Sequence, residues 1–287
     1  MIEYIDRGGE IEITGVRDFD LVRIFECGQC FRWDFSENGS YTGVALGRAA
    51  RLRQDRGSVF ITGTAGDFEN IWFDYFDLGR DYEEIRRKIS IDDFMKKAVS
   101  FGAGIRILRQ DRWEALCSFI ISQCNNIPRI KKIVAALCHE FGDKIEFDGN
   151  RYYSFPSAER LAALEADDLA PLRCGYRAEY IIGAARAVAS GGLDLDALAR
   201  GAVPQARQAL TKLRGVGDKV ADCALLFGLN MLDAFPRDVW IRRAISQYYG
   251  PEFDPAVFSP YGGIAQQYMF YYIRCTKGLS IDKPADL

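Results

Sequence analysis

The pattern of hydrophobic and polar residues divides the chain into a first part typical of β-strands and a longer part typical of helices. Within the first ninety residues, short apolar or alternating segments are separated by Gly, Asn and Asp, as in an antiparallel sheet. The predicted strands lie in segments 10–14, 30–35, 41–46, 50–54 and 59–62. From residue 67 onward the hydrophobic spacing becomes helical. The predicted helices are 81–89, 91–102, 111–123, 127–141, 158–165, 177–190, 204–213, 218–229, 238–249 and 260–276.

The sequence therefore predicts an α+β protein, with an antiparallel sheet lobe at residues 1–90 and a helical domain at 91–287. With 48% hydrophobic and 13% aromatic residues in 287, the composition is that of a well-packed globular protein. No stretch approaches eighteen consecutive apolar residues, and the first residues lack the basic and apolar regions of a secretion signal. We therefore expect an intracellular protein whose eight cysteines stay reduced.

Charge is unevenly distributed along the chain. Residues 1–95 contain 12 Lys and Arg against 19 Asp and Glu, whereas the remainder contains 25 against 21. The net charges of the two parts are therefore −7 and +4, within a total of −3. Because nucleic acid binding needs only a local basic surface, the total charge does not exclude it, and this asymmetry makes the second part the one suited to an anionic partner.

The run Leu-Arg-Gly-Val-Gly-Asp-Lys at residues 213–219 is the most informative motif. Gly215 and Gly217, with Val216 between them, join two predicted helices, so free backbone N–H groups of the second helix can face an anion such as a phosphate. An ordinary helix–helix turn with a glycine cap is the alternative interpretation, and no P-loop pattern accompanies the glycines.

Lys219 and Asp238 are the candidate catalytic pair. Lys219 lies in the first turn of the second helix, where the helix dipole, and Arg214 if it lies close by, favour the neutral, nucleophilic amine. Asp238 follows Pro236 and Arg237, where a further helix begins, so it can be an N-cap and also present a carboxylate that stabilises positive charge. A solvent-facing lysine and a purely structural cap are the alternatives.

Two cysteines form a Cys-x-x-Cys motif at residues 27–30. A zinc site is disfavoured because there is no second such motif and the only histidine, His139, is on another predicted helix. A redox role is disfavoured because no βαβ pattern surrounds the motif. Cys223 lies four residues after Lys219 on the same helical face, and Phe227 extends this face, which would otherwise be interpreted as core.

With these motifs, the chain resembles the helix-hairpin-helix DNA glycosylases with a Gly/Pro-rich loop and aspartate (HhH-GPD), and among them the 8-oxoguanine DNA glycosylases of the human type. The resemblance covers residues 10–276. It implies a TATA-binding-protein-like sheet lobe packed on a helical HhH-GPD body. It also implies that the hairpin at 213–219 binds a DNA phosphate without reading a base.

The resemblance further implies which residues bind the flipped base. The segment at 27–33 is similar to the family's Gly-Gln-x-Phe-Arg-Trp segment, in which the glycine carbonyl, here of Gly28, approaches the lesion. Oxidised guanine carries an N–H at N7 where guanine has an acceptor, so this carbonyl would distinguish the two bases. Phe270 and Cys223 would contact the two faces of the base, with Phe227 on the cysteine's side, and Gln266 would bind the Watson–Crick edge.

Five further residues are implied at the opposite strand. Arg129 and Arg177 correspond to arginines that contact the cytosine left unpaired, whose N3 and O2 are acceptors. Tyr176 corresponds to a side chain wedged into the base stack. Cys124 departs from the family, which usually has an asparagine at this gap-filling position, and Asn125 is a candidate to compensate.

The function implied is excision of 8-oxoguanine, preferably opposite cytosine, from double-stranded DNA through a Schiff base on Lys219, followed by strand nicking by β-elimination. The alternatives are a glycosylase for alkylated bases and a non-catalytic protein that binds damaged DNA. We expect a monomer with no membrane partner and no required cofactor. A monovalent cation at the hairpin is compatible with the resemblance. Because only Cys275 follows Cys223, a C-terminal four-cysteine iron–sulfur cluster is excluded.

Overall fold

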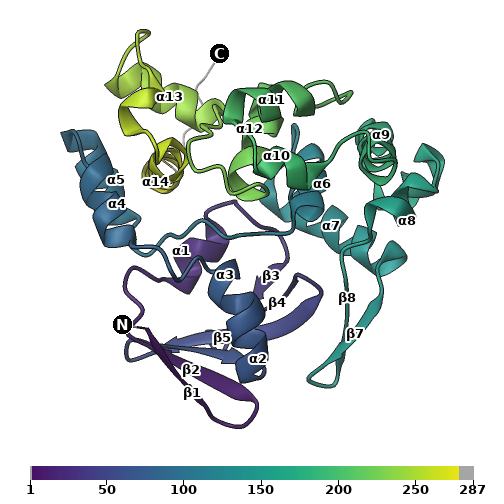
Figure 1. The fold of residues 1–287 in the computed structure, drawn as a ribbon, viewed down its shortest axis with the longest axis horizontal. Helices are drawn as coiled ribbons and strands as arrows, with labels where there is room; N and C mark the ends of the chain where they lie inside the picture. The colour runs from purple at the N-terminus through teal and green to yellow at the C-terminus, as the bar shows by residue number, and fades with distance from the viewer. Residues whose placement is uncertain (1, 278–287) are drawn as a thin grey trace, which may run out of the picture.

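The computed structural model describes residues 2–277 and shows an antiparallel sheet packed on a larger helical body (Figure 1). The six strands follow the order β1-β2-β6-β5-β4-β3, and every neighbouring pair is antiparallel. They are β1 (Glu3–Asp6), β2 (Glu10–Thr14), β3 (Trp33–Phe35), β4 (Tyr41–Ala45), β5 (Arg48–Asp55) and β6 (Ser58–Thr62). This confirms the predicted α+β class and antiparallel sheet. The edge strand β1 was not predicted, because all four of its residues are exposed and no hydrophobic alternation marks it.

Each of the ten predicted helical ranges corresponds to an observed helix. These are α4 (Tyr82–Ile89), α5 (Asp93–Phe101), α6 (Arg112–Ile121), α7 (Ile127–Phe141), α8 (Ala158–Ala162), α9 (Arg177–Ala189), α11 (Val203–Leu210), α12 (Asp218–Phe227), α13 (Val239–Tyr248) and α14 (Gly262–Lys277).

The sequence pattern did not predict several shorter elements, which offer too few residues for a recognisable period. They are α1 (Leu21–Glu26), α2 (Ala65–Asp67), the π-helical turn η1 (Phe68–Trp72), α3 (Phe73–Tyr75), the 3₁₀ segments η2 (Ala166–Leu172) and η3 (Pro255–Phe258), α10 (Leu195–Ala199), and a hairpin of β7 (Lys144–Phe147) and β8 (Asn150–Tyr153).

The sheet and the helical body have separate cores that interlock at their boundary. Helices α1 and α3 lie against the sheet, and their aromatic residues pack with Trp33 and Tyr41 (Figure 1). Cys27 and Phe31 precede β3 in the chain but belong to the core of the helical body. Leu108, which precedes α6, belongs to the core of the sheet. The two parts are therefore joined through hydrophobic packing as well as through the chain.

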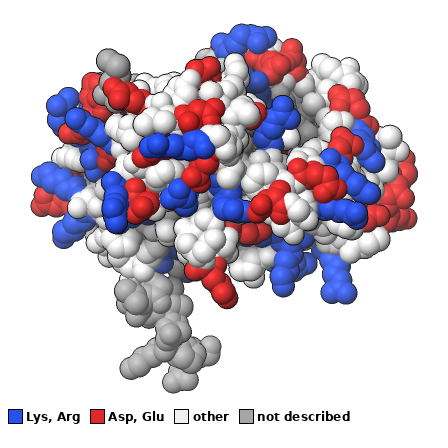
Figure 2. Space-filling model, turned by 90° about the horizontal axis from the view of Figure 1, so that it is seen from below, with Lys and Arg blue, Asp and Glu red and all other residues white. Residues whose placement is uncertain are grey.

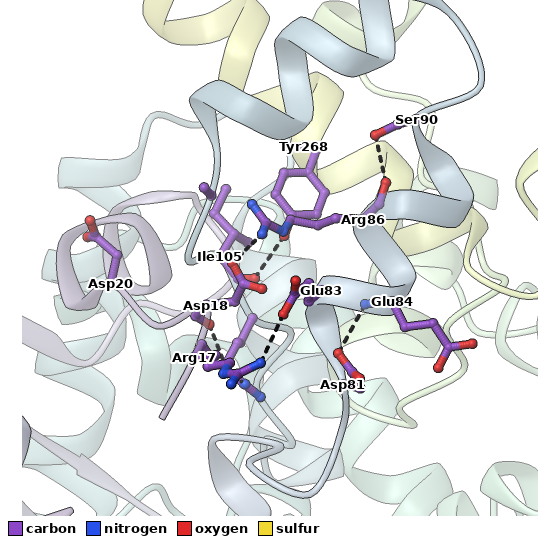
Figure 3. A network of polar contacts seen from close by, with 12 residues as sticks. Arg17, Asp18, Asp20, Asp81, Glu83, Glu84, Arg86, Ser90, Ile105 and Tyr268 are labelled. Carbon is purple, nitrogen blue, oxygen red and sulfur yellow. Dashed lines mark hydrogen bonds and ion pairs between the residues drawn. The ribbon is translucent and has the colours of Figure 1, made fainter. Parts of the chain in front are cut away.

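A polar network ties the loop after β2 to α4 and α14 (Figure 3). Arg86 of α4 forms an ion pair of 2.9 Å with Asp18, and Tyr268 of α14 donates a hydrogen bond to the carbonyl oxygen of Ile105. The buried Arg106 donates to the carbonyl oxygens of Arg17, Asp18 and Asp77 over 2.7–2.9 Å. Because these carbonyls belong to irregular segments, the guanidinium replaces the hydrogen bonds that secondary structure would otherwise supply.

Gln29 likewise supplies hydrogen bonds to irregular backbone, in this case at the Cys27–Cys30 loop. Its fully buried amide donates to the carbonyl oxygens of Ile24 (2.9 Å) and Arg106 (2.8 Å) and accepts from the Leu108 N–H (2.9 Å). The Gln29 backbone carbonyl in turn accepts from Gln110 over 2.7 Å. One side chain thus fixes the loop against the segment that leads into α6.

We predict that Gln29→Leu lowers the free energy of unfolding by about 2–4 kcal/mol, because buried amide and carbonyl groups lose their partners. Denaturant unfolding monitored by circular dichroism would measure this. Gln208→Leu, at an exposed position of α11, is the matched control and should change stability by less than about 0.5 kcal/mol. Equal effects of the two substitutions would contradict the structural role given to Gln29.

Candidate active site

The hairpin between α11 and α12 depends on its two glycines in different ways. Gly215 has a φ of +82°, and a Cβ there would lie 2.2 Å from Cδ2 of Tyr180, so no other residue fits without movement. Gly217 has a φ of −90°, faces open space and is the N-cap of α12 without a side-chain hydrogen bond. The first N–H groups of α12 therefore have no side-chain cap from this residue and remain suited to an anion, while Val216 is buried.

Lys219 and Asp238 line the same cavity. Lys219 is partly buried, its Nζ lies 3.4 Å from Oγ of Ser122, and the amine lies 5.6 Å from the ring centre of Phe119. Arg214, expected near this amine, instead forms an ion pair of 2.7 Å with Glu179.

Asp238 is the N-cap of α13, as predicted, and accepts a hydrogen bond of 2.8 Å from the Ile241 N–H. Burial raises the pKa of the Asp238 carboxyl, while the Ile241 N–H and the charge of Lys219 act in the opposite direction.

The cavity has a volume of about 430 Å³ and is formed by the Cys27–Cys30 loop, α6, the start of α7, the starts of α12 and α13, and α14. Its lining includes Gly28, Phe31, Phe119, Ser122, Asn125, Asn126, Ile127, Pro128, Ile130, Lys219, Asp238, Trp240, Phe270 and Arg274. A larger cavity of about 650 Å³ lies beside α7, β4 and β8 and is lined by none of the predicted site residues. We place the candidate site in the smaller cavity, because Lys219 and Asp238 both line it.

Of the five residues expected to bind a base, Gly28 and Phe270 line this cavity, whereas Cys223, Gln266 and Phe227 are not among its lining residues. Gly28 has a φ of +81°, and the preceding carbonyl, of Cys27, accepts a hydrogen bond of 2.7 Å from Gln267. Gln266 is buried, and its Oε1 has no hydrogen-bond partner among the residues described. Phe227 stacks on Phe119, which does line the cavity, with ring centres 5.2 Å apart.

Cys223 is buried, and burial raises the pKa of its thiol to about 11. The charge of Lys219 lowers this pKa and the charge of Asp238 raises it, so the thiol is within the electrostatic influence of both groups. A neutral thiol in this position offers a polarisable apolar surface, as a contact for a ring requires.

The expected opposite-strand residues gather around the loop at residues 122–126, which connects α6 and α7. Arg177 is buried, and its guanidinium donates to the carbonyl oxygens of Gln123 (2.8 Å from Nε), Cys124 and Cys174. It therefore supports the loop from inside. Arg129 is exposed, with one long hydrogen bond of 3.5 Å from its Nη2 to the Arg173 carbonyl.

The remaining residues of this group lie at the surface or beneath it. Cys124 is exposed and has a left-handed φ of +48°, a conformation that asparagine adopts more readily than cysteine. Asn125 donates to the Ile121 carbonyl over 3.3 Å, so its amide nitrogen is engaged within the loop. Tyr176 is 52% exposed, and its ring lies 5.6 Å from that of Tyr180. An exposed aromatic residue at the N-terminus of α9 is available to contact a partner.

Among the cavity residues that sequence reasoning did not assign to the site are Ser122, Trp240 and Arg274. Ser122 lies directly before the Gln123-Cys124-Asn125 run, and Trp240 follows Asp238 by two residues. Arg274 lies four residues after Phe270, so the helical spacing of α14 was the signal that could have revealed it.

Two further observations concern residues 2–277. No helix there is long and apolar enough to cross a membrane. In the same range, no group of three or more His, Cys, Asp and Glu side chains is arranged to hold a metal ion.

The surface view in Figure 2, taken from below Figure 1, shows basic and acidic side chains interspersed over the described residues of that face. A phosphate backbone would find no continuous basic surface on this described face.

Comparison with known proteins matches both parts of the chain. Residues 13–116 match the family "8-oxoguanine DNA glycosylase, N-terminal domain", and residues 117–256 match "HhH-GPD superfamily base excision DNA repair protein". The N-glycosylase/DNA lyase of Saccharomyces cerevisiae is 33% identical over 255 residues, covering 80% of this chain and 68% of the yeast protein.

Two solved structures are similar over almost their whole length. The structure of MBOgg1 in complex with a low-affinity DNA ligand has a TM-score of 0.92 and 44% identity, covering 96% of this chain and 99% of that one. The Clostridium acetobutylicum 8-oxoguanine glycosylase/lyase, in complex with double-stranded DNA containing cytosine opposite 8-oxoG, has a TM-score of 0.90 and 38% identity, with coverages of 96% and 98%.

We predict that Asp238→Asn, which can still cap α13, leaves the protein as stable as the wild type or more stable at neutral pH, because the buried carboxylate is removed. A carboxyl whose folded-state pKa is raised favours the protonated state on folding. The wild type should therefore gain stability relative to the variant as the pH falls through the raised folded pKa toward the unfolded one. Urea unfolding at several pH values measures this difference.

Asp238→Ala is the control and should lose about 1 kcal/mol through the missing cap. A large loss of stability in Asp238→Asn at neutral pH would show that the negative charge itself supports the fold.

Proposed function

The chain belongs to the 8-oxoguanine DNA glycosylases of the HhH-GPD superfamily, and from this premise we propose that it excises 8-oxoguanine from double-stranded DNA and then cleaves the strand. The observation that carries the proposal is the meeting of Lys219 and Asp238 in one cavity beside Gly28 and Phe270. An amine, a carboxylate and an aromatic surface are the groups needed to attack a sugar, stabilise its positive charge and hold its base.

DNA binding places the damaged nucleotide at this cavity. The uncapped N–H groups at the start of α12 bind a backbone phosphate, which fixes the position of the duplex without reading sequence. Tyr176, exposed at the N-terminus of α9, enters the base stack while the lesion rotates out of the duplex. The flipped nucleotide then has its sugar near Lys219 and its base toward α14.

Excision exchanges one bond at C1′ for another. The neutral amine of Lys219 attacks C1′, and the glycosidic bond breaks with its electron pair leaving on the base. Positive charge develops on the sugar, and the Asp238 carboxylate stabilises it without moving, because the helix N-cap already holds it in place. Opening of the sugar ring gives a Schiff base on Lys219. Removal of a C2′ proton then expels the 3′ phosphate.

Base recognition uses a backbone carbonyl and a buried side-chain acceptor. The Gly28 carbonyl accepts a hydrogen bond from N7–H, which guanine lacks. The buried Oε1 of Gln266, which has no partner among the described residues, accepts from the N–H groups of the Watson–Crick edge. An unfilled buried acceptor is costly, so the site discriminates against bases that lack these donors. Phe270 and Cys223 contact the two faces of the ring.

Recognition of the opposite cytosine is assigned to Arg129. Its guanidinium is exposed and only weakly engaged, so it is free to donate to N3 and O2 of the unpaired base. Arg177 can make the second contact only by exchanging its hydrogen bonds to Gln123 and Cys124. We therefore assign Arg177 first to the support of the loop.

The family also includes glycosylases for alkylated bases, which use the aspartate with water and lack the lysine. Lys219 therefore argues against that alternative. A protein that only binds damage would not need a lysine and a carboxylate in one cavity. Incubation with an oligonucleotide containing one 8-oxoguanine opposite cytosine, in the presence of borohydride, separates the three functions. A covalent adduct supports our proposal, free base without an adduct supports the second, and binding without excision supports the third.

We predict that Lys219→Gln abolishes both base excision and borohydride trapping, because the amine is removed while length and polarity are kept. Binding to the lesion duplex should remain, since phosphate and pocket contacts are intact. Lys144→Gln, at an exposed position of β7, is the matched control and should behave as the wild type. An adduct of wild-type yield in Lys219→Gln would identify another amine as the nucleophile.

We predict that the wild type excises the lesion faster opposite cytosine than opposite adenine, and that Arg129→Ala narrows this preference by about 1–3 kcal/mol. Adenine presents an amino donor on its pairing edge, which leaves the arginine unpaired. Single-turnover rates with each of the four opposite bases measure the effect. Equal rates in the wild type would remove this role from Arg129, and weaker binding to all duplexes alike would identify a phosphate contact instead.

A further inference from the structure

Arg274 of α14 places a half-buried guanidinium, with one buried and unpaired nitrogen, beside the candidate base-binding cavity. Its Nη2 donates to the carbonyl oxygen of Glu26, which fixes the orientation of the guanidinium. Its Nη1 is buried and has no hydrogen-bond partner among the residues described. A donor of this kind is costly to leave unpaired. The cost is repaid if a ligand supplies an acceptor.

The unpaired nitrogen lies next to the residue that reads N7. A Cβ added to Gly28 would be 3.6 Å from Nη1 of Arg274 and 3.4 Å from the ring of Phe270. The guanidinium carbon is 5.5 Å from the ring centre of Phe270, and Arg274 lines the same cavity as Lys219 and Asp238. An acceptor bound in the cavity beside Gly28 and Phe270 would therefore lie close to this donor.

We propose that Nη1 of Arg274 donates a hydrogen bond to O8 of the flipped 8-oxoguanine, so that this residue determines specificity for the lesion. The inference rests on the proposed function and deepens it. O8 and the hydrogen on N7 are the two groups that distinguish the lesion from guanine. The Gly28 carbonyl reads the second, and Arg274 reads the first.

The geometry of α14 selects O8 over O6. Gln266, Phe270 and Arg274 follow one another at intervals of four residues, so they lie along one face of the helix with a rise of about 6 Å between successive residues. If Gln266 binds the Watson–Crick edge and Phe270 lies on the ring, Arg274 is beyond the opposite edge. That edge carries N7 and O8, whereas O6 is on the side of Gln266.

The contact would act against guanine as well as in favour of the lesion. Guanine has a C–H group at position 8, which offers Nη1 no acceptor and leaves the buried cation unpaired. A site that hydrogen-bonds a substrate group rejects an analogue without that group much more strongly than a purely apolar pocket could. Arg274 and Gly28 would thus recognise two different groups, O8 and N7–H, that the oxidation of guanine introduces.

The decisive variant is Arg274→Met, which keeps the apolar stem and removes the guanidinium. Single-turnover excision of 8-oxoguanine opposite cytosine should slow by about tenfold or more, as expected for a lost charged hydrogen bond. Affinity for a duplex with a tetrahydrofuran abasic analogue, which has no base, should stay at the wild-type value. Equal loss of affinity for the analogue would show a structural or phosphate-binding role and overturn the proposal.

A second substrate tests whether O8 is the atom that accepts the hydrogen bond from Arg274. Replacing O8 by sulfur, as in 8-thioguanine, gives a weaker acceptor and should slow the wild type more than Arg274→Met. The same slowing in both proteins would overturn the assignment to O8. Arg274→Lys should recover only part of the rate, because an ammonium lacks the second nitrogen that binds Glu26.

Arg86→Met is the matched control, because Arg86 also has a buried, unpartnered nitrogen, its Nε, but lies in the network of Figure 3 and does not line the cavity. This variant should lose stability without a selective loss of lesion excision. If the wild type neither binds nor excises 8-oxoguanine, the proposed function fails. If the wild type excises it and Arg274→Met is equally fast, only the role of Arg274 fails.

Discussion

The site depends on one buried side chain, Gln29, which holds in place the backbone around Gly28, the residue that we propose contacts the base. Gly28 sits in a left-handed conformation on a loop that belongs to neither the sheet nor a helix. Its neighbours are fixed from two directions, by the Gln29 amide toward Arg106 and Leu108, and by Gln267 of α14 toward the Cys27 carbonyl. A backbone carbonyl discriminates between bases only if it cannot retreat from an unfavourable one, so this rigidity is part of the chemistry.

Each charged side chain of the cavity makes a contact within the protein that fixes its position in the absence of DNA. Asp238 caps α13, Lys219 contacts Ser122, and Arg274 holds the Glu26 carbonyl. Each side chain is thus oriented by the protein, and a nucleotide meets groups that need little reorganisation. The pKa of Asp238 is raised in this arrangement because burial disfavours the charged carboxylate more than its hydrogen bonds and Lys219 favour it.

The sequence predicted the sheet, the long helices and the positions of Lys219 and Asp238 at the starts of two helices, because each of these is encoded by local patterns. Alternation marked β2, helical spacing marked α12 and α13, and the position of Asp238 before α13 indicated its cap. Phe227 was assigned to the base pocket because it shares a helical face with Cys223, but packing turns it onto Phe119. Spacing along one helix cannot show which neighbour covers a residue.

Tertiary contacts also decided the orientations of Arg177 and Arg274, which the sequence could not. Arg177 is drawn inward by carbonyl groups of a loop more than fifty residues away. Arg274 donates to the carbonyl oxygen of Glu26, which lies 248 residues earlier in the sequence.

The contact between Tyr180 and Gly215 makes α9 and the hairpin a single rigid piece. Tyr180 fills the space that a side chain at Gly215 would need, and its ring also touches Tyr176, the exposed residue at the start of the same helix. If the hairpin holds a phosphate and Tyr176 enters the base stack, as proposed, the separation of the two is set by protein packing and not by the DNA. The piece would then act as a ruler, because a bound phosphate fixes which nucleotide along the strand is tested.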